Sequence, residues 1–283
     1  MTKCAGLLGY PVSHSSSPRL HGFWIQKYGL DASYEAHEVQ PDELMSQIAD
    51  LKSHIEQTGN EFRGCNLTLP LKETIIPYID QLEQAASEIG AVNTLVISEN
   101  GELQGKNTDW IGFRDSLGDH LNLDRFVNGT ALVLGAGGAA RAILYALKSM
   151  GFSKIFLTNR TQARAQHLAN EMKNIPIEVV PWDEKEQMLS KTDLLVNTTS
   201  LGMKGQPPLI LDLTDLKKTA VVTDIVYAPL ETELLKQARL KGHSVVDGLG
   251  MLLHQAKAGF EAWFGVYPEV DKDLRHHVLE GLK

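Results

Sequence analysis

A glycine-rich turn between a short apolar run and an amphipathic helical segment constrains this chain more than any other feature. The run Ala131–Leu134 leads directly into Gly135, and Gly135, Gly137 and Ala140 form the pattern G-x-G-x-x-A. The first glycine permits a tight turn, the second lets backbone approach a pyrophosphate, and the alanine allows close packing of helix on strand. The pattern predicts a dinucleotide-binding unit; the alternative is a tight turn with only a structural role.

The end of the next strand-like run indicates which dinucleotide would bind. In NAD sites an acidic residue stands there and accepts hydrogen bonds from the adenosine ribose. This chain has Asn159, Arg160, Thr161 and Arg164 instead. No carboxylate repels a 2′-phosphate, and two guanidinium groups are available to hold one bidentately. The segment therefore predicts NADP, against the alternative of ordinary arginines on a surface helix that starts at Thr161.

Strand-like and helix-like runs alternate along most of the chain, which is typical of a mainly parallel α/β sheet. Two short strands around Asn100-Gly101 are expected to form a hairpin, because Asn-Gly is a strong hairpin turn signal. The other strands are expected at 5–10, 34–39, 62–69, 131–134, 154–159, 178–180, 193–197, 221–224 and 244–246. We predict two α/β domains that divide near residues 105–112.

Composition and charge exclude several classes of function. The net charge of −8 argues against a nucleic-acid surface, and it means that an anionic ligand must be held by local donors. No apolar run approaches the length of a membrane span, and the N-terminus lacks a signal pattern. Cys4 and Cys65 lie in apolar surroundings without metal-ligand spacing, which predicts buried thiols. We expect a cytoplasmic protein with no metal, no nucleic acid and no membrane contact.

The segment "SHSSSP", residues 13–18, places several hydroxyl groups beside an apolar strand. Ser17 before Pro18 is a good N-cap with proline at the first helical position. One cap needs one hydroxyl, however, and a helix start with spare hydroxyls is also a small anion site. Ser15 and Ser17, two apart in an extended chain, face the same side. This segment alone favours the cap over the anion site.

Polar side chains recur at the ends of apolar strands, which is where ligands bind in open α/β sheets. A lysine and an aspartate beside several amides also suit a solvated surface, because lysines are usually exposed. The residues in question are Asn66, Thr68, Lys72, Asn93, Asn107 and Asp109.

Together these segments closely resemble the shikimate dehydrogenase family from end to end. The matching motifs, in chain order, are "GYPVSHSSSP" with His21, "NLTLPLK", "GAVNT", "NTDWIGF", "GAGGAAR", "NRTQAR", "NTTSLGM", "DIVYAPLET" and "DGLGMLLHQA". One departure is Gly22, where the family commonly has asparagine; glycine weakens the local helix propensity.

The resemblance implies a fold, an activity and a set of ligands. The fold is an N-terminal, mainly parallel α/β substrate domain, residues 1–106, completed by C-terminal helices from about 255 to 283. A Rossmann-type NADP-binding domain spans 107–254. The activity is reversible NADP-dependent oxidoreduction between 3-dehydroshikimate and shikimate, in aromatic amino acid precursor biosynthesis. We expect these small molecules as partners and a monomer or homodimer.

The resemblance also implies roles for individual residues. Lys72 and Asp109 resemble the catalytic pair, and Ser15 and Ser17 resemble the anchors of the shikimate carboxylate. The groups that hold the ring and its hydroxyls are Asn66, Thr68, Asn93, Asp109, Tyr227 and Gln255. The NADP contacts are Gly135, Ala136, Gly137, Gly138, Ala139, Ala140, Asn159, Arg160, Thr161, Arg164, Ile225 and Gly248.

Two questions stay open at the level of sequence. Lysine is mostly protonated at neutral pH, so Lys72 is either a base made effective by its surroundings or a charged donor that steadies an alkoxide while Asp109 orients it. The rival functions are a quinate dehydrogenase with broader substrate or NAD use, a non-catalytic ligand sensor, and a purely structural protein. The presence of both Lys72 and Asp109 argues against the sensor.

Overall fold

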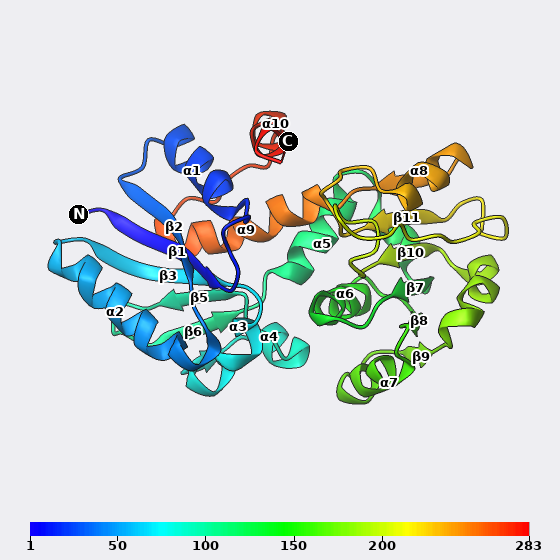
Figure 1. Ribbon diagram of the computed structural model, residues 1–283, viewed down its shortest axis with the longest axis horizontal. Helices are drawn as coiled ribbons and strands as arrows, with labels where there is room; N and C mark the ends of the chain where they lie inside the picture. The colour runs from blue at the N-terminus through cyan, green and yellow to red at the C-terminus, as the bar shows by residue number, and fades with distance from the viewer. Residues whose placement is uncertain (283) are drawn as a thin grey trace. The chain divides into compact units, whose positions relative to one another are not determined.

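The computed structural model describes residues 1–282 and divides into two compact units (Figure 1). Unit 1 contains residues 1–108 together with the chain from Gln255 onward, and unit 2 contains Asp109–His254. The chain passes between the units after Thr108 and again within helix α9 (Leu249–Phe264). No helix among residues 1–282 is both long enough and apolar enough to cross a bilayer.

Unit 1 alternates strands and helices over its first half. Its strands are β1 (Lys3–Gly9), β2 (Ala32–Glu38), β3 (Glu61–Leu67), β4 (Gln81–Leu82), β5 (Thr94–Ile97) and β6 (Leu103–Lys106). Its helices, besides the end of α9, are α1 (Ser17–Lys27), η1 (Pro41–Glu43), α2 (Leu44–Gln57), α3 (Leu71–Thr74), η2 (Ile76–Tyr78), α4 (Gln84–Ile89) and α10 (Lys272–Glu280).

The sheet of unit 1 has the order β2-β1-β3-β5-β6-β4. The first three strands are parallel, whereas β5 runs antiparallel to both β3 and β6. The turn between β5 and β6 includes Gly101, whose φ of +87° lies in the left-handed region that favours glycine. The predicted strands and the predicted hairpin at Asn100-Gly101 are thus confirmed.

The two faces of this sheet are covered by different helices (Figure 1). Side chains from α2, α3 and α4 pack on one face, and Leu44, Leu71 and Ala86 there are almost fully buried. On the other face α1 and α9 contribute large aromatic rings, among them Trp24 and Phe260, whose centroids lie 5.2 Å apart. The same face contains Tyr34, whose hydroxyl donates a hydrogen bond to Asn66.

Unit 2 has the alternation expected of a nucleotide-binding fold. Its strands are β7 (Thr130–Leu134), β8 (Lys154–Thr158), β9 (Ile177–Val179), β10 (Leu194–Asn197), β11 (Val221–Asp224) and β12 (Ser244–Val246). Its helices, besides the start of α9, are α5 (Asp109–Gly118), η3 (Leu123–Phe126), α6 (Gly138–Ser149), α7 (Gln162–Glu171), η4 (Trp182–Lys191) and α8 (Glu233–Leu240).

Every strand pair in the sheet of unit 2 is parallel, in the order β12-β11-β10-β7-β8-β9. Read from the other edge, this is the doubly wound order 3-2-1-4-5-6 of dinucleotide-binding domains. The order reverses between β7 and β10, and the carboxyl ends of strands at such a reversal are where ligands bind in open α/β sheets. The expected Rossmann-type fold is confirmed.

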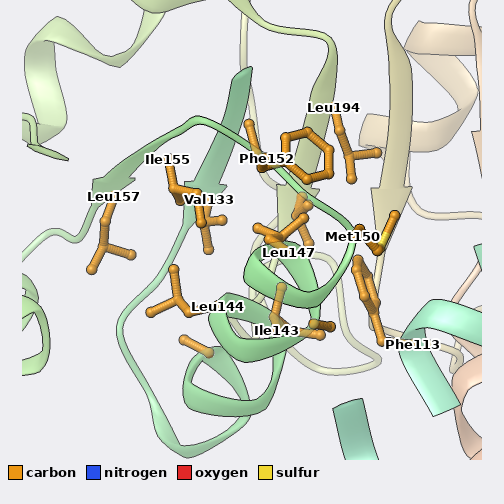
Figure 2. Close-up of a cluster of buried hydrophobic side chains, with 14 of the residues drawn as sticks. Phe113, Val133, Ile143, Leu144, Leu147, Met150, Phe152, Ile155, Leu157 and Leu194 are labelled. Atoms are coloured by element: carbon orange, nitrogen blue, oxygen red, sulfur yellow. The ribbon is translucent and has the colours of Figure 1, made fainter. Parts of the chain in front are cut away.

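The core of unit 2 follows from the alternation of side chains along β7. Val133 faces α5, α6 and α7, where it belongs to the cluster with Ile143, Leu147 and Phe113 that Figure 2 shows. Leu132 lies in a second cluster, with η4 and α8. Successive residues of a strand point to opposite faces, so a continuous apolar run is what a sheet covered on both sides requires.

Candidate functional site

The serine segment differs in one respect from the sequence-based prediction. Helix α1 begins at Ser17 with Ser16 as its N-cap, and no side chain makes a capping hydrogen bond there. Ser15 Oγ accepts a hydrogen bond from Ser17 N at 3.2 Å and donates one to Ser17 Oγ at 3.3 Å. The prediction of Ser17 as N-cap is wrong, because the helical conformation already starts at Ser16. The hydroxyls of Ser15 and Ser17 lie together, as predicted.

Three of the amides predicted as substrate contacts meet within unit 1. Asn66, near the end of β3, donates from Nδ2 to the backbone oxygen of Asn93 at 3.1 Å. Asn93, just before β5, donates from its own Nδ2 to Gln255 Oε1 at 3.4 Å. Asn66 is 5% exposed and Asn93 3% exposed. Buried amides need partners, so the Asn93 backbone holds the Asn66 side chain and the side chains of Asn93 and Gln255 hold each other.

Thr68 and Lys72 both come after the end of β3. Thr68 follows β3 directly, and its backbone N–H donates to the Leu8 oxygen of β1 at 2.9 Å. Lys72 lies in the short helix α3, and its backbone oxygen accepts from Val92 N at 2.8 Å. This bond ties the position of Lys72 to the residue next to Asn93.

Asn107 has a structural role. Its Nδ2 donates to the backbone oxygen of Ala91 at 2.9 Å, and the residue is 1% exposed. Asn107 thus joins the chain after β6 to the loop before β5. Asp109, two residues later, is the first residue of α5 and belongs to unit 2.

The glycine-rich turn of unit 2 has the geometry that its sequence predicts. Gly135 has a φ of +108°, and a β-carbon there would lie 2.7 Å from the hydroxyl oxygen of Thr198. Gly137, just before α6, has open space where a β-carbon would stand, and Ala140 is fully buried against the sheet. An open backbone at a helix N-terminus suits a phosphate, so these residues fit a dinucleotide.

Asn159, directly after β8, is hydrogen-bonded to this turn. Its Oδ1 accepts from Ala136 N at 3.1 Å, and its Nδ2 donates to the Thr161 oxygen at 2.9 Å. Thr161 is the N-cap position of α7, which begins at Gln162. Arg160 and Arg164 are exposed, and neither has an ion-pair partner among residues 1–282. Two exposed guanidiniums with no carboxylate on them suit a phosphate ligand.

The sequence-based prediction of the site missed a buried carboxylate at the end of β11. Asp224 accepts from Asn197 Nδ2 at 2.9 Å, from Val226 N at 3.0 Å and from Thr232 Oγ1 at 2.8 Å. Burial raises the pKa of Asp224, which is fully enclosed. The carboxylate joins β10, β11 and the start of α8. A sequence signal existed, since Asn197 and Asp224 open two of the motifs quoted above.

Ile225 and Gly248, both predicted as cofactor contacts, lie side by side. A β-carbon at Gly248 would stand only 2.3 Å from the backbone oxygen of Ile225, so the two backbones touch. Tyr227 follows on the same segment, and burial raises the pKa of its hydroxyl. The structure therefore groups these residues beyond the ends of β11 and β12.

Comparison with known proteins accounts for this arrangement. Three family models match: the shikimate dehydrogenase substrate binding domain at residues 7–95, shikimate/quinate 5-dehydrogenase at 120–225, and the shikimate 5′-dehydrogenase C-terminal domain at 248–275. The chain is 50% identical over 280 residues to the shikimate dehydrogenase (NADP(+)) of Rhodospirillum rubrum, covering 98% of this chain and 97% of that protein. This protein belongs to the shikimate dehydrogenase family.

Solved structures of shikimate dehydrogenase family proteins extend the likeness to the fold. The crystal structure of shikimate 5-dehydrogenase from Thermus thermophilus, in complex with NADP(H) and shikimate, matches with a TM-score of 0.80 at 36% identity over 99% of both chains. Quinate dehydrogenase from Corynebacterium glutamicum, in complex with NAD, matches with a TM-score of 0.85 at 32% identity, again over 99% of both chains. The family predicted from the motifs is confirmed.

Proposed function

We propose that this protein catalyses the reversible NADP-dependent interconversion of 3-dehydroshikimate and shikimate. The observation that carries the proposal is 50% identity, over nearly the whole chain, to a protein named shikimate dehydrogenase (NADP(+)). Unit 1 is the substrate-binding domain in this proposal and unit 2 the NADP-binding domain. The match of residues 7–95 to a substrate-binding family model supports the first assignment, and the doubly wound sheet of unit 2 supports the second.

Different residues of unit 1 bind different chemical groups of the substrate in this proposal. The paired hydroxyls of Ser15 and Ser17 at the start of α1 bind the carboxylate, because they add donors to a helix N-terminus. The amides of Asn66, Asn93 and Gln255, with Thr68, bind the ring hydroxyls. Tyr227 contributes a hydroxyl, and Asp109 contributes an acceptor for a substrate hydroxyl.

Lys72 and Asp109 handle the proton of the reacting hydroxyl. In the direction of ketone reduction, the Lys72 ammonium donates a proton to the oxygen that becomes the alcohol. In the direction of oxidation, Lys72 accepts the hydroxyl proton or stabilises the alkoxide, while Asp109 orients that hydroxyl. NADP supplies the hydride acceptor, C4 of the nicotinamide, and NADPH the hydride donor.

The NADP-binding residues come from the turn after β7 and from the strand ends beside it. Gly135 to Ala140 hold the pyrophosphate at the N-terminus of α6, and Asn159 to Arg164 hold the adenosine end. Arg160 and Arg164 select NADP over NAD, because only NADP has a 2′-phosphate to pair with a guanidinium. Ile225 and Gly248 complete the site around the nicotinamide half.

Initial-rate assays of shikimate and quinate, each with NADP and with NAD, test the proposal. We expect the highest kcat/KM for shikimate with NADP. Preference for quinate with NAD would favour the second candidate, which the likeness to the Corynebacterium glutamicum enzyme supports. Absence of turnover with all four pairs would contradict the proposed activity.

We also propose a cytoplasmic location and a monomer or homodimer. Cys4 and Cys65 are both buried as free thiols, which suits a reducing compartment. Light scattering on the purified protein distinguishes the two assemblies by mass, and fractionation of cells tests the location.

A further inference from the structure

Tyr34, in β2, contacts one of the amides proposed to bind the substrate, although the sequence-based prediction gave Tyr34 no role. Its hydroxyl donates to Asn66 Oδ1 at 2.6 Å. The ring is 8% exposed and stacks on His21, with centroids 4.0 Å apart and an angle of 12° between the planes. Burial raises the pKa of Tyr34 well above its usual value, so the hydroxyl keeps its proton and remains a donor.

Backbone groups settle which way two of the amides face. The backbone oxygen of Asn93 can only accept, so the atom of Asn66 that contacts it at 3.1 Å is the NH₂ nitrogen. The other end of Asn66, its oxygen, therefore faces Tyr34. The backbone N–H of Thr108 can only donate, so the atom of Asn93 that contacts it at 2.8 Å is the oxygen. The Asn93 nitrogen is consequently the end that reaches Gln255 Oε1.

The hydroxyl of Thr94 links these two amides in one direction. It accepts from Asn66 Nδ2 at 3.2 Å and donates to Asn93 Oδ1 at 3.0 Å. The donors and acceptors thus run from Tyr34 through Asn66, Thr94 and Asn93 to Gln255. We call these five residues the amide chain. All five belong to unit 1, and Thr94 is fully buried.

We propose that Tyr34 and Thr94 are positioning residues that hold the side chains of Asn66, Asn93 and, through Asn93, Gln255 in place for the substrate. The inference deepens the proposed function and rests on it. Both hydrogens of the Asn66 amide are used within the amide chain, its Oδ1 accepts from Tyr34, and the buried His21 ring also interacts with the Asn66 side chain.

The variant Tyr34→Phe removes the hydroxyl and keeps the ring that stacks on His21. It leaves the buried Asn66 oxygen without its donor, and we expect KM for shikimate to rise roughly tenfold, the usual effect of one lost hydrogen bond of this kind. KM for NADP should stay within about twofold, because the amide chain contains no residue of unit 2.

Tyr28→Phe is the matched control. The Tyr28 hydroxyl accepts from Glu269 N at 3.1 Å, and its ring lies near Phe260, but it does not belong to the amide chain. This variant should keep the wild-type KM for shikimate. An equal rise of KM in both variants, or a wild-type KM in a folded Tyr34→Phe protein, would overturn the inference.

A second pair of variants tests the middle of the amide chain and serves if Tyr34→Phe does not fold. Thr94→Val removes the hydroxyl at nearly constant volume, whereas Thr94→Ser keeps it. We expect a rise in KM for shikimate of about tenfold in the first and recovery in the second. Equal kinetics of the two variants would contradict the inference.

The double variant Tyr34→Phe/Thr94→Val tests whether Tyr34 and Thr94 act in one hydrogen-bond network or independently of each other. Members of one hydrogen-bond network are not additive, so the double variant should be little worse than the poorer single variant. Full multiplication of the two effects would count against the amide chain. A wild-type protein that does not turn over shikimate would instead refute the proposed function, which keeps the two failures distinct.

Discussion

Among single residues, the hydroxyls at the start of α1 show how a small change in backbone conformation alters a side chain's role. Ser16 already has helical angles, with φ −81° and ψ −5°, so the helix starts one residue before the expected position. Ser15 Oγ then accepts the N–H of Ser17, and the Ser17 hydroxyl makes no capping bond. Both hydroxyls lie at a helix N-terminus, where an anion is favoured.

The variant Ser17→Ala should therefore weaken substrate binding and spare stability. Loss of a hydrogen bond to a carboxylate costs about 1.5–3 kcal/mol, so KM for shikimate should rise by about one to two orders of magnitude. Fluorescence titration should give wild-type affinity for NADP. A large drop in Tm with an unchanged KM would mean that Ser17 stabilises the helix after all.

His21 makes the free energy of unfolding depend on pH below about 6.5. Its ring is fully buried among Tyr34, Trp24 and other aromatic rings, and burial lowers its pKa from 6.5 to about 3. Between these values the unfolded chain binds a proton that the folded protein does not. Stability contributed by the neutral ring is present above pH 6.5 and is lost as pH falls towards 3, by about 1.4 kcal/mol per pH unit.

The variant His21→Phe removes this titration and keeps an aromatic ring. We expect the free energy of unfolding, wild type minus variant, to fall by roughly 2–3 kcal/mol between pH 7.5 and pH 4.5. Urea unfolding at several pH values measures it. A constant difference across this range would show that His21 is not kept neutral by the fold.

At the scale of elements, the turn from β7 into α6 contains two glycines, two residues apart, whose surroundings differ. Gly135 needs its positive φ and has no room for a β-carbon beside Thr198, whereas Gly137 has φ −93° and open space. The fold requires the first glycine, whereas the second is explained by the proposed approach of the pyrophosphate.

Alanine substitution at each position distinguishes an effect on stability from an effect on NADP binding. Gly135→Ala should lower stability by about 1–3 kcal/mol, the cost of a strained backbone, with a visible drop in Tm. Gly137→Ala should leave Tm near the wild-type value and raise KM for NADP, because the new methyl group enters the space of the pyrophosphate. Equal Tm losses in both variants would leave Gly137 with a purely structural role.

At the scale of the whole molecule, the two residues of the proposed catalytic pair belong to two different helices. Lys72 follows β3 in unit 1, and Asp109 opens α5 in unit 2. The chain crosses from unit 1 to unit 2 directly before Asp109, so this residue stands at the boundary in sequence.

Single and double variants test whether the two residues serve one reaction. Lys72→Ala should lower kcat by about 10²–10⁴-fold, with a smaller change in KM for shikimate. Asp109→Asn should lower kcat as well and raise KM. If the residues act together, the double variant is far less than multiplicatively worse than either single one. Full multiplication would separate them, and a Lys72→Ala protein with most of its kcat would end the assignment.

Local patterns predicted the strands, the hairpin and the dinucleotide turn correctly, because each depends on residues close together in the chain. The buried strands are apolar runs, Asn100-Gly101 supplies the hairpin turn, and Gly135 meets a backbone requirement that no other residue satisfies easily. The dinucleotide turn and the two arginines after β8 were predicted from local pattern, whereas the roles of the substrate-side residues were predicted through the family's motifs.

The amide chain and the buried carboxylate depended on tertiary structure. Tyr34 and Asn66 are 32 residues apart, and Asn93 and Gln255 are 162 apart. Such partners meet only after the strands pair in one register and α9 packs on the sheet, and a shift of one residue would turn each side chain to the other face. Local periodicity carries no information about that pairing. The directions of the Asn66 and Asn93 amides were decided in the same way, by which backbone acceptor or donor the folded sheet placed beside each of them.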